Sequence, residues 1–131
     1  MIYTTYFGNL KNLPKNIIPI SICYKAPDWW NGLQYRKLAP KYEFFKVWKE
    51  TKDNDYYIEH FNSEVLGVLD HPTTVIMELK HLCDKSVYDK VDIALVCYEK
   101  PTDFCHRHLV AKWLRSGGYE CKEYEVKKYD K

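Results

Sequence analysis

Short apolar runs near both ends of the chain predict β-strands. Residues 2–7 and 17–23 are rich in β-branched and aromatic side chains, a composition that favours strands. Residues 93–96 are apolar without interruption, as in a central parallel strand covered on both faces. Residues 120–126 alternate and predict a last strand. Because Pro19 has no amide to donate, we expect the second strand to lie at an edge or to carry a bulge.

The middle of the chain has the three- and four-residue spacing of amphipathic helices. We expect the first helix to begin at Pro40, which suits a first helical turn, and to end at residues 53–55. The second should end at residues 70–72, where the third begins, and the fourth should end at Gly117 and Gly118. In chain order, their apolar positions are Phe44, Phe45 and Trp48; Ile58, Phe61, Val65, Val68 and Leu69; Val75, Ile76, Leu79 and Leu82; and Leu109, Val110, Trp113 and Leu114.

This order of elements predicts a small three-layer α/β domain with a largely parallel sheet of about four strands. The domain is expected to span residues 1–126, followed by a short polar tail at 127–131. The link between the first two strands is shorter than the dozen residues that a parallel crossover usually needs. It is therefore the weakest point of the predicted parallel sheet.

Composition narrows the possible partners. The 131 residues include 20 Lys and Arg against 18 Asp and Glu, so we do not expect a nucleic acid to be the partner. No apolar run approaches the roughly 18 residues that span a bilayer, and the first residues do not resemble a signal peptide. Five cysteines at irregular spacing predict reduced thiols and a cytoplasmic protein. The oligomeric state is not indicated.

The main candidate site is the strand, turn and helix at residues 91–114. Alternation along the strand places Cys97 and Glu99 on one side and Tyr98 on the other. Helical spacing turns Cys105 and His106 towards the sheet and His108 towards solvent. We therefore expect one crevice to be bordered by the reactive and charged side chains of this segment, which are Cys97, Glu99, Cys105, His106 and Arg107.

Several chemistries fit these residues. Arg107 and the free amides at the helix start could hold a phosphate or carboxylate, or Arg107 could form a structural ion pair with Glu99. Cys105 could be a nucleophile whose pKa is lowered by the helix dipole and by His106 or Arg107, or it could be a small buried apolar residue. Glu99 could be a general base or nucleophile, or could only order the turn.

Zinc binding by Cys97, Cys105 and His106 is a further possibility that the sequence disfavours. Neighbouring Cys and His side chains at a helix start are expected to diverge, and no CxxC or HxxxH pair supports them. We therefore expect neither a metal nor a cofactor.

The aperiodic segment at residues 24–39 is expected to be a binding loop or lid. Trp29, Trp30 and Tyr35 could stack on a base while Lys25, with Arg36 and Lys37, neutralises a phosphate. Alternatively, these aromatic side chains fill the core or cover the edge of the sheet. The remaining histidines, which we expect to be structural, are His60, His71 and His81.

The string CYEKPTDFCHRHLVAKWL at residues 97–114 resembles the motif of a bacterial, archaeal and phage family called domain of unknown function 488 (DUF488). The likeness extends to the opening IYTTYFGNL, the Pro-Trp segment at residues 27–32 and Leu-Ala-Pro at 38–40. It implies a small α/β fold with a largely parallel sheet, and its motif matches Cys97, Glu99, Cys105, His106 and Arg107. It implies no activity. The chain departs from many members in its short first crossover and in having Cys-Tyr-Lys at 23–25 where they carry an Arg-rich segment.

These features together predict an enzyme that binds and acts on a small anionic, nucleotide-like ligand. Arg107 would hold the anion, Glu99 or Cys105 with His106 would act on the ligand, and Trp29 or Trp30 would close over it. Two alternatives remain: a non-catalytic module that sequesters a metabolite or docks a protein, and a thiol-redox or metal-regulated domain that uses Cys97 and Cys105.

Overall fold

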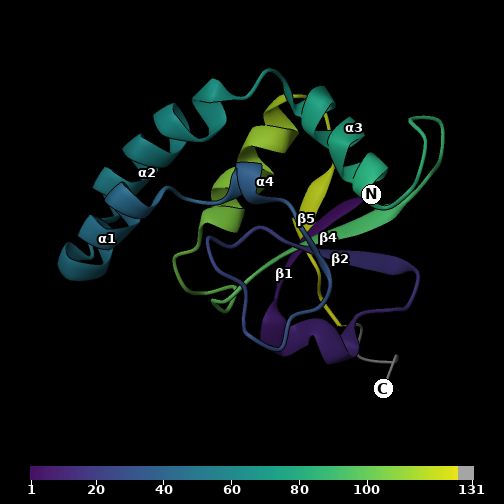
Figure 1. Ribbon diagram of the computed structural model, residues 1–131, viewed down its shortest axis with the longest axis horizontal. Helices are drawn as coiled ribbons and strands as arrows, with labels where there is room; N and C mark the ends of the chain where they lie inside the picture. Colours follow the sequence, from purple (N-terminus) through teal and green to yellow (C-terminus); the bar gives the residue numbers. More distant parts are fainter. Residues whose placement is uncertain (127–131) are drawn as a thin grey trace.

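The protein is built around one parallel sheet, as a computed structural model of the chain shows for residues 1–126 (Figure 1). Five strands run in the order β3-β2-β4-β1-β5, and every neighbouring pair is parallel. The predicted α/β class and parallel sheet are therefore confirmed. The strands are β1 (Ile2–Tyr6), β2 (Ile17–Ser21), β3 (Leu33–Gln34), β4 (Asp92–Cys97) and β5 (Cys121–Glu123).

Four α-helices contribute side chains to the larger hydrophobic core. This core includes Ile20 and Leu95 from the sheet, Phe44 and Phe61 from the first two helices, and Leu114 from the last. A smaller cluster contains Phe7 and Val96, against which Leu10 and Trp30 pack. The helices are α1 (Tyr42–Thr51), α2 (Asn54–Glu64), α3 (Pro72–Leu82) and α4 (His106–Ser116), and the 3-10 helices are η1 (Phe7–Asn12), η2 (Arg36–Leu38) and η3 (Leu66–Val68).

The short link between β1 and β2 is compatible with a parallel sheet because these strands are not neighbours. β4 lies between them and pairs with both, while η1 makes the connection. Pro19 sits in an uninterrupted register with Ala94, so β2 carries no bulge there. β3 pairs with β2 only at Ile20 and Ser21, which leaves Pro19 beyond the end of that pairing.

Several predicted boundaries were wrong, and a predicted loop contains regular structure. The second helix ends at Glu64 and continues as η3, where Val68 is 69% exposed instead of buried. Glycine is a poor helix former, and the observed turn leaves no room for a side chain at Gly67, because a Cβ there would lie 2.9 Å from the carbonyl oxygen of Asn62. The last strand is shorter than residues 120–126. The segment at 24–39 contains β3 and η2, which are too short to leave a periodic pattern.

The arrangement brings the carboxyl end of β4 to the amino end of α4. Parallel α/β sheets bind ligands at the carboxyl ends of their strands, so this end of the sheet is where a site is expected. None of the helices within residues 1–126 has the length and apolar character of a membrane-spanning segment.

Candidate functional site

A cavity of about 630 Å³ opens at the carboxyl end of β4. It lies between the end of the sheet, the residues that follow β2, the face of α1 and the start of α4. A volume of this size suits a small-molecule ligand. The side chains that line it are Cys23, Tyr24, Lys25, Pro40, Tyr42, Phe45, Lys46, Trp48, Lys49, Lys52, Tyr57, Cys97, Tyr98, Glu99, Phe104, Cys105 and His106.

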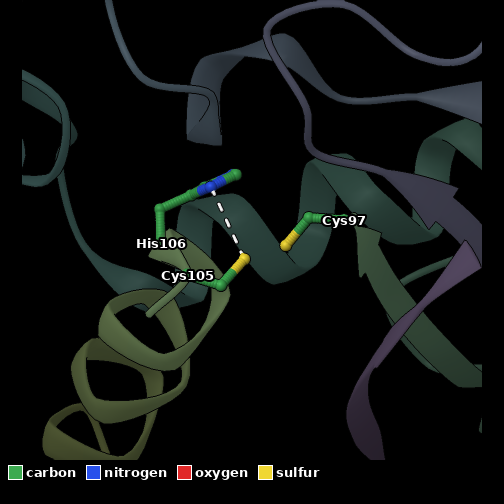
Figure 2. Close-up of side chains that lie close together, drawn as sticks. All are labelled: Cys97, Cys105 and His106. Atoms are coloured by element: carbon green, nitrogen blue, oxygen red, sulfur yellow. Dashed lines mark hydrogen bonds between the residues drawn. The ribbon is translucent and has the colours of Figure 1, made fainter. Parts of the chain in front are cut away.

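Two thiols and an imidazole meet in this cavity. The potential ligand atoms of Cys97, Cys105 and His106 all lie within 4.8 Å of one another, and Cys105 Sγ is 4.0 Å from His106 Nδ1 (Figure 2). Cys105 is the residue before the first turn of α4 and has an extended backbone, with φ −154° and ψ 142°. Its side chain therefore does not follow helical geometry and does not diverge from His106. The expected divergence of this pair was wrong.

A backbone hydrogen bond determines which nitrogen of His106 faces the thiols. Nε2 lies 2.7 Å from the carbonyl oxygen of Ile22, which can only accept, so Nε2 carries the proton and donates. In the neutral ring Nδ1 then has a free lone pair directed towards Cys105. The imidazole is thus held in one orientation by a residue that directly follows β2.

Burial determines the protonation state of the Cys105 thiol, which is not activated as a nucleophile. Cys105 is 4% exposed, and burial raises its pKa, with a further increase from its hydrogen bond to Cys97. His106 opposes this shift but does not reverse it. The expected lowering of this pKa was therefore wrong. Burial also raises the pKa of Cys23 to about 12, so both thiols are neutral at physiological pH.

Arg107 lies beneath the cavity and does not line it. Its side chain is fully buried, and Nε and Nη2 each donate to the carboxylate of Glu123 at 3.0 Å. Nη1 donates to the main-chain oxygen of Glu99 at 2.6 Å and lies 3.7 Å from Cys97 Sγ. The expected placement of Arg107 as an anion ligand was wrong, and so was the expected ion pair with Glu99. The Glu123 carboxylate instead accepts two parallel hydrogen bonds from the planar guanidinium.

Glu99 does line the cavity. Its main-chain oxygen accepts a hydrogen bond from Arg107, but no hydrogen bond within residues 1–126 involves its carboxylate. Tyr98 was expected on the opposite side and lines the same cavity, because β4 ends at Cys97 and strand alternation ends with it. The Tyr98 hydroxyl donates to the main-chain oxygen of Lys25 at 2.6 Å and ties the segment after β2 to this turn.

The opposite wall is a face of α1 that the sequence analysis did not identify as part of the site. Lys46, Lys49 and Lys52 recur every three residues and line the cavity together with Phe45 and Trp48. The Lys49 ammonium lies 5.5 Å from the Phe45 ring centre, and that of Lys52 lies 4.3 Å from the Trp48 ring centre. The spacing of the lysines was visible in the sequence, but it is also the spacing of an ordinary solvated helix face.

Four further aromatic residues in the lining were not predicted: Tyr24, Tyr42, Tyr57 and Phe104. Tyr57 of α2 is 2% exposed, and no hydrogen bond within the described chain involves its hydroxyl. Burial raises the pKa of this phenol, which is therefore neutral. Its ring makes an edge contact with Phe104, which in turn packs on Trp48. No local pattern separates these residues from core aromatics.

The loop aromatics that were expected to close over a ligand lie elsewhere. Trp30 packs on Phe7 and donates to the main-chain oxygen of Leu33 at 3.1 Å, while Trp29 is 61% exposed beside it. Tyr35 is buried and donates to Glu78 at 2.8 Å. Of the predicted loop residues, only Lys25 lines the cavity.

His108 differs from its expected position on the solvent side of α4. It is half-buried, and its Nε2 is buried without a hydrogen-bond partner within residues 1–126. Burial lowers its pKa, and the nearby charge of Arg107 lowers it further. His108 does not line the cavity, so it is not part of the candidate site.

Comparison with protein-family models identifies a relationship that covers most of the chain. Residues 11–118 match the family model DUF488-N3a, described as the active DUF488-N3 subclade. The chain belongs to the DUF488 family. This confirms the resemblance seen in the motif at residues 97–114, which lies within the matched region. Comparisons with curated proteins and with solved structures gave no match.

Proposed function

We propose that this DUF488 protein is an enzyme that binds a small anionic, nucleotide-like ligand in the cavity between α1 and the carboxyl end of β4. The main support is that a wall of lysines and a group of reactive side chains meet in one cavity of suitable size. Four lysines and one carboxylate line it, which favours a negatively charged occupant.

The lysine wall suggests how the ligand is oriented. A phosphate near Lys46, Lys49 and Lys52 would be neutralised by their ammonium groups, which are common phosphate ligands. The rings of Trp48 and Phe45 offer apolar surfaces on which a planar base can stack. A nucleotide combines both parts, whereas inorganic phosphate lacks the ring and a nucleoside lacks the charge.

The residues proposed to act on the ligand are Glu99, Cys105 and His106. Glu99 has a carboxylate free to exchange a proton with a ligand, which is the role of a general acid or base. Cys105 and His106 lie where the reacting group of a ligand would approach the end of the sheet. Arg107 takes no direct part, since its guanidinium is committed to Glu123 and Glu99.

A ligand screen tests the binding part. Thermal shift and calorimetry should detect adenosine or guanosine mono- or diphosphates, because a ligand that binds only the folded state raises its melting temperature. The matching nucleosides and inorganic phosphate should bind more weakly. The double variant Lys46→Met/Lys49→Met should lose about 10-fold in affinity, or roughly 1.4 kcal/mol.

Lys112→Met is the matched control, because Lys112 is exposed on α4 and does not line the cavity. It should bind like the wild type. Equal weakening by the control and by the double variant, or no nucleotide binding at all, would contradict the proposed ligand class.

Turnover tests the catalytic part. Any nucleotide that binds should be incubated with wild-type protein and with Glu99→Gln, and the products separated by chromatography. Wild-type protein should convert the ligand, and the variant should retain binding but convert it at least about 100-fold more slowly. A ligand recovered unchanged from wild-type protein would instead support a non-catalytic binding module.

A further inference from the structure

We propose that Cys97, Cys105 and His106 form a zinc site at the floor of the cavity, with one coordination position open to the ligand. Three different backbone positions supply these donors: the last residue of β4, the residue before α4 and the first residue of α4. Figure 2 shows the two sulfur atoms and the imidazole directed towards one another. The cluster differs from a lone cysteine because three ligand atoms of the types zinc prefers already lie within 4.8 Å.

The spacing of the three atoms is close to that of a tetrahedral site. Zn–S bonds of about 2.3 Å and Zn–N bonds of about 2.0–2.1 Å place two sulfurs about 3.8 Å apart and a sulfur and nitrogen about 3.6 Å apart. Cys105 Sγ and His106 Nδ1 are 4.0 Å apart, and no pair in the cluster exceeds 4.8 Å. Small side-chain rotations are therefore enough to bring all three donors onto one ion.

The surroundings orient the donors for a metal ion. His106 donates from Nε2 to the carbonyl oxygen of Ile22, which leaves Nδ1 as the free donor. Metal-binding histidines usually have such a partner on the other ring nitrogen. Arg107 Nη1 lies 3.7 Å from Cys97 Sγ and can donate to a coordinated thiolate. On binding Zn²⁺ both thiols would release their protons, and the two thiolates would balance the charge of the ion.

The site is open on one side. All three donors line the cavity, and so does Glu99, whose carboxylate no other group within residues 1–126 engages. Three protein ligands with a free fourth position are typical of catalytic zinc, and two Cys with one His are a known set. A zinc ion there would provide a Lewis acid beside the proposed acid-base residue. The zinc site would change the proposed role of Cys105 and His106 from direct action on the ligand to metal binding, and it goes beyond the proposed function because metal binding does not require the proposed ligand.

Spectroscopic titration with Co²⁺ is a direct test. The protein should be reduced, stripped of metal with a chelator and titrated with Co²⁺ in the absence of nucleotide. We expect one Co²⁺ per chain, with sulfur-to-cobalt charge-transfer absorption, the intense visible bands of tetrahedral Co²⁺, and loss of both on adding Zn²⁺. Zn²⁺ should also raise the melting temperature of the wild-type protein.

Three variants locate the ligands. Cys97→Ser and Cys105→Ser should each weaken Co²⁺ binding more than about 100-fold, beyond the effect usual for residues that only support a ligand. His106→Gln should do the same while keeping an amide that can donate to Ile22. Cys83→Ser is the control, because Cys83 follows α3 outside the cluster. It should bind Co²⁺ like the wild type.

Two results of the titration would overturn the zinc site. In one, reduced wild-type protein binds no stoichiometric Co²⁺; in the other, both cysteine variants bind Co²⁺ as tightly as the wild type. A Cys97–Cys105 disulfide that persists under reducing conditions, seen as a mass two hydrogens lower, would also overturn it. Circular dichroism of each metal-free variant checks folding, and the wild-type titration remains decisive if a variant does not fold. Lys46→Met/Lys49→Met should keep full Co²⁺ affinity, so failure of the nucleotide site and failure of the metal site give different results.

Discussion

Arg107 of α4 and Glu123 of β5 form a bidentate ion pair beneath the candidate site. Two guanidinium nitrogens each donate to one carboxylate oxygen at 3.0 Å, and Thr4 donates to the same carboxylate at 2.7 Å. The third guanidinium nitrogen, Nη1, donates to the main-chain oxygen of Glu99. The pair therefore joins the last helix, the edge strand and the turn that carries Glu99. It supports the site from below instead of contacting a ligand.

Arg107→Met should destabilise the fold by about 3 kcal/mol, because it leaves the mostly buried Glu123 carboxylate without its charge partner. Urea unfolding monitored by circular dichroism measures this loss. Arg115→Met is the control on the same helix, where the lost bond is a single one to the Cys121 carbonyl and the cost should be about 1 kcal/mol. Similar unfolding midpoints for the two variants would show that the buried pair is not a main support of the fold.

Trp30→Ala should be much more damaging than Trp29→Ala. Trp30 packs on the Phe7 cluster and donates to Leu33, so its loss should cost about 3 kcal/mol of unfolding free energy. Trp29 is mostly exposed, and its replacement should cost less than about 1 kcal/mol. Neither variant should change nucleotide affinity if both remain folded. Loss of nucleotide binding in Trp29→Ala would restore the hypothesis of an aromatic lid.

The Tyr35–Glu78 contact should make stability depend on pH in the acidic range. Hydrogen bonds from Lys37 and Tyr35 lower the pKa of Glu78 below its usual value. The charged carboxylate is thus favoured in the folded state, and its contribution is present above the unfolded pKa and lost as the pH falls through the folded pKa. Glu78→Gln should therefore cost about 1 kcal/mol at pH 7 and progressively less below about pH 4. Chemical unfolding of both proteins at several pH values measures the gap, and a constant gap would exclude this linkage.

Salt should weaken nucleotide binding through the lysine wall. Exposed charges are screened over about 8 Å at physiological ionic strength, so raising NaCl from about 50 to 500 mM should increase the dissociation constant of a bound nucleotide. Lys46→Met/Lys49→Met should show a shallower dependence, and the matching nucleoside almost none. Equal slopes for the two proteins would mean that these lysines do not face the phosphate.

The sequence alone was informative wherever a local pattern carried the signal. The uninterrupted apolar run at residues 93–96 predicted a central strand, and β4 indeed pairs with β1 and β2 on its two sides. Gly117 and Gly118 marked the end of α4, and Pro72 the start of α3. Boundaries were less accurate at β3 and η3. Two paired residues, or a single 3-10 turn after Glu64, are too short to have a period.

The candidate site was only partly predictable, because local patterns describe only residues that are close together in the chain. Cys97, Glu99, Cys105 and His106 lie close together in the chain around one turn, so a shared site there could be predicted, although Glu99 and Cys105 lie just outside the strand and helix whose geometry was used. The lysine wall of α1 could not be assigned to them, because its spacing is equally that of a helix facing solvent. Only the packing of α1 against α2 turns this face towards the cavity.

The α/β class, the strand-turn-helix at residues 91–114 and the family could be predicted from local patterns, since each depends on residues that are neighbours in the chain. The side-chain partners of the site residues depend on the tertiary structure. Arg107 binds Glu123 because β5 returns beside β1, and His106 presents Nδ1 to the thiols because Ile22 arrives next to it after β2. Contacts of this kind depend on where distant segments meet, and no local periodicity encodes that.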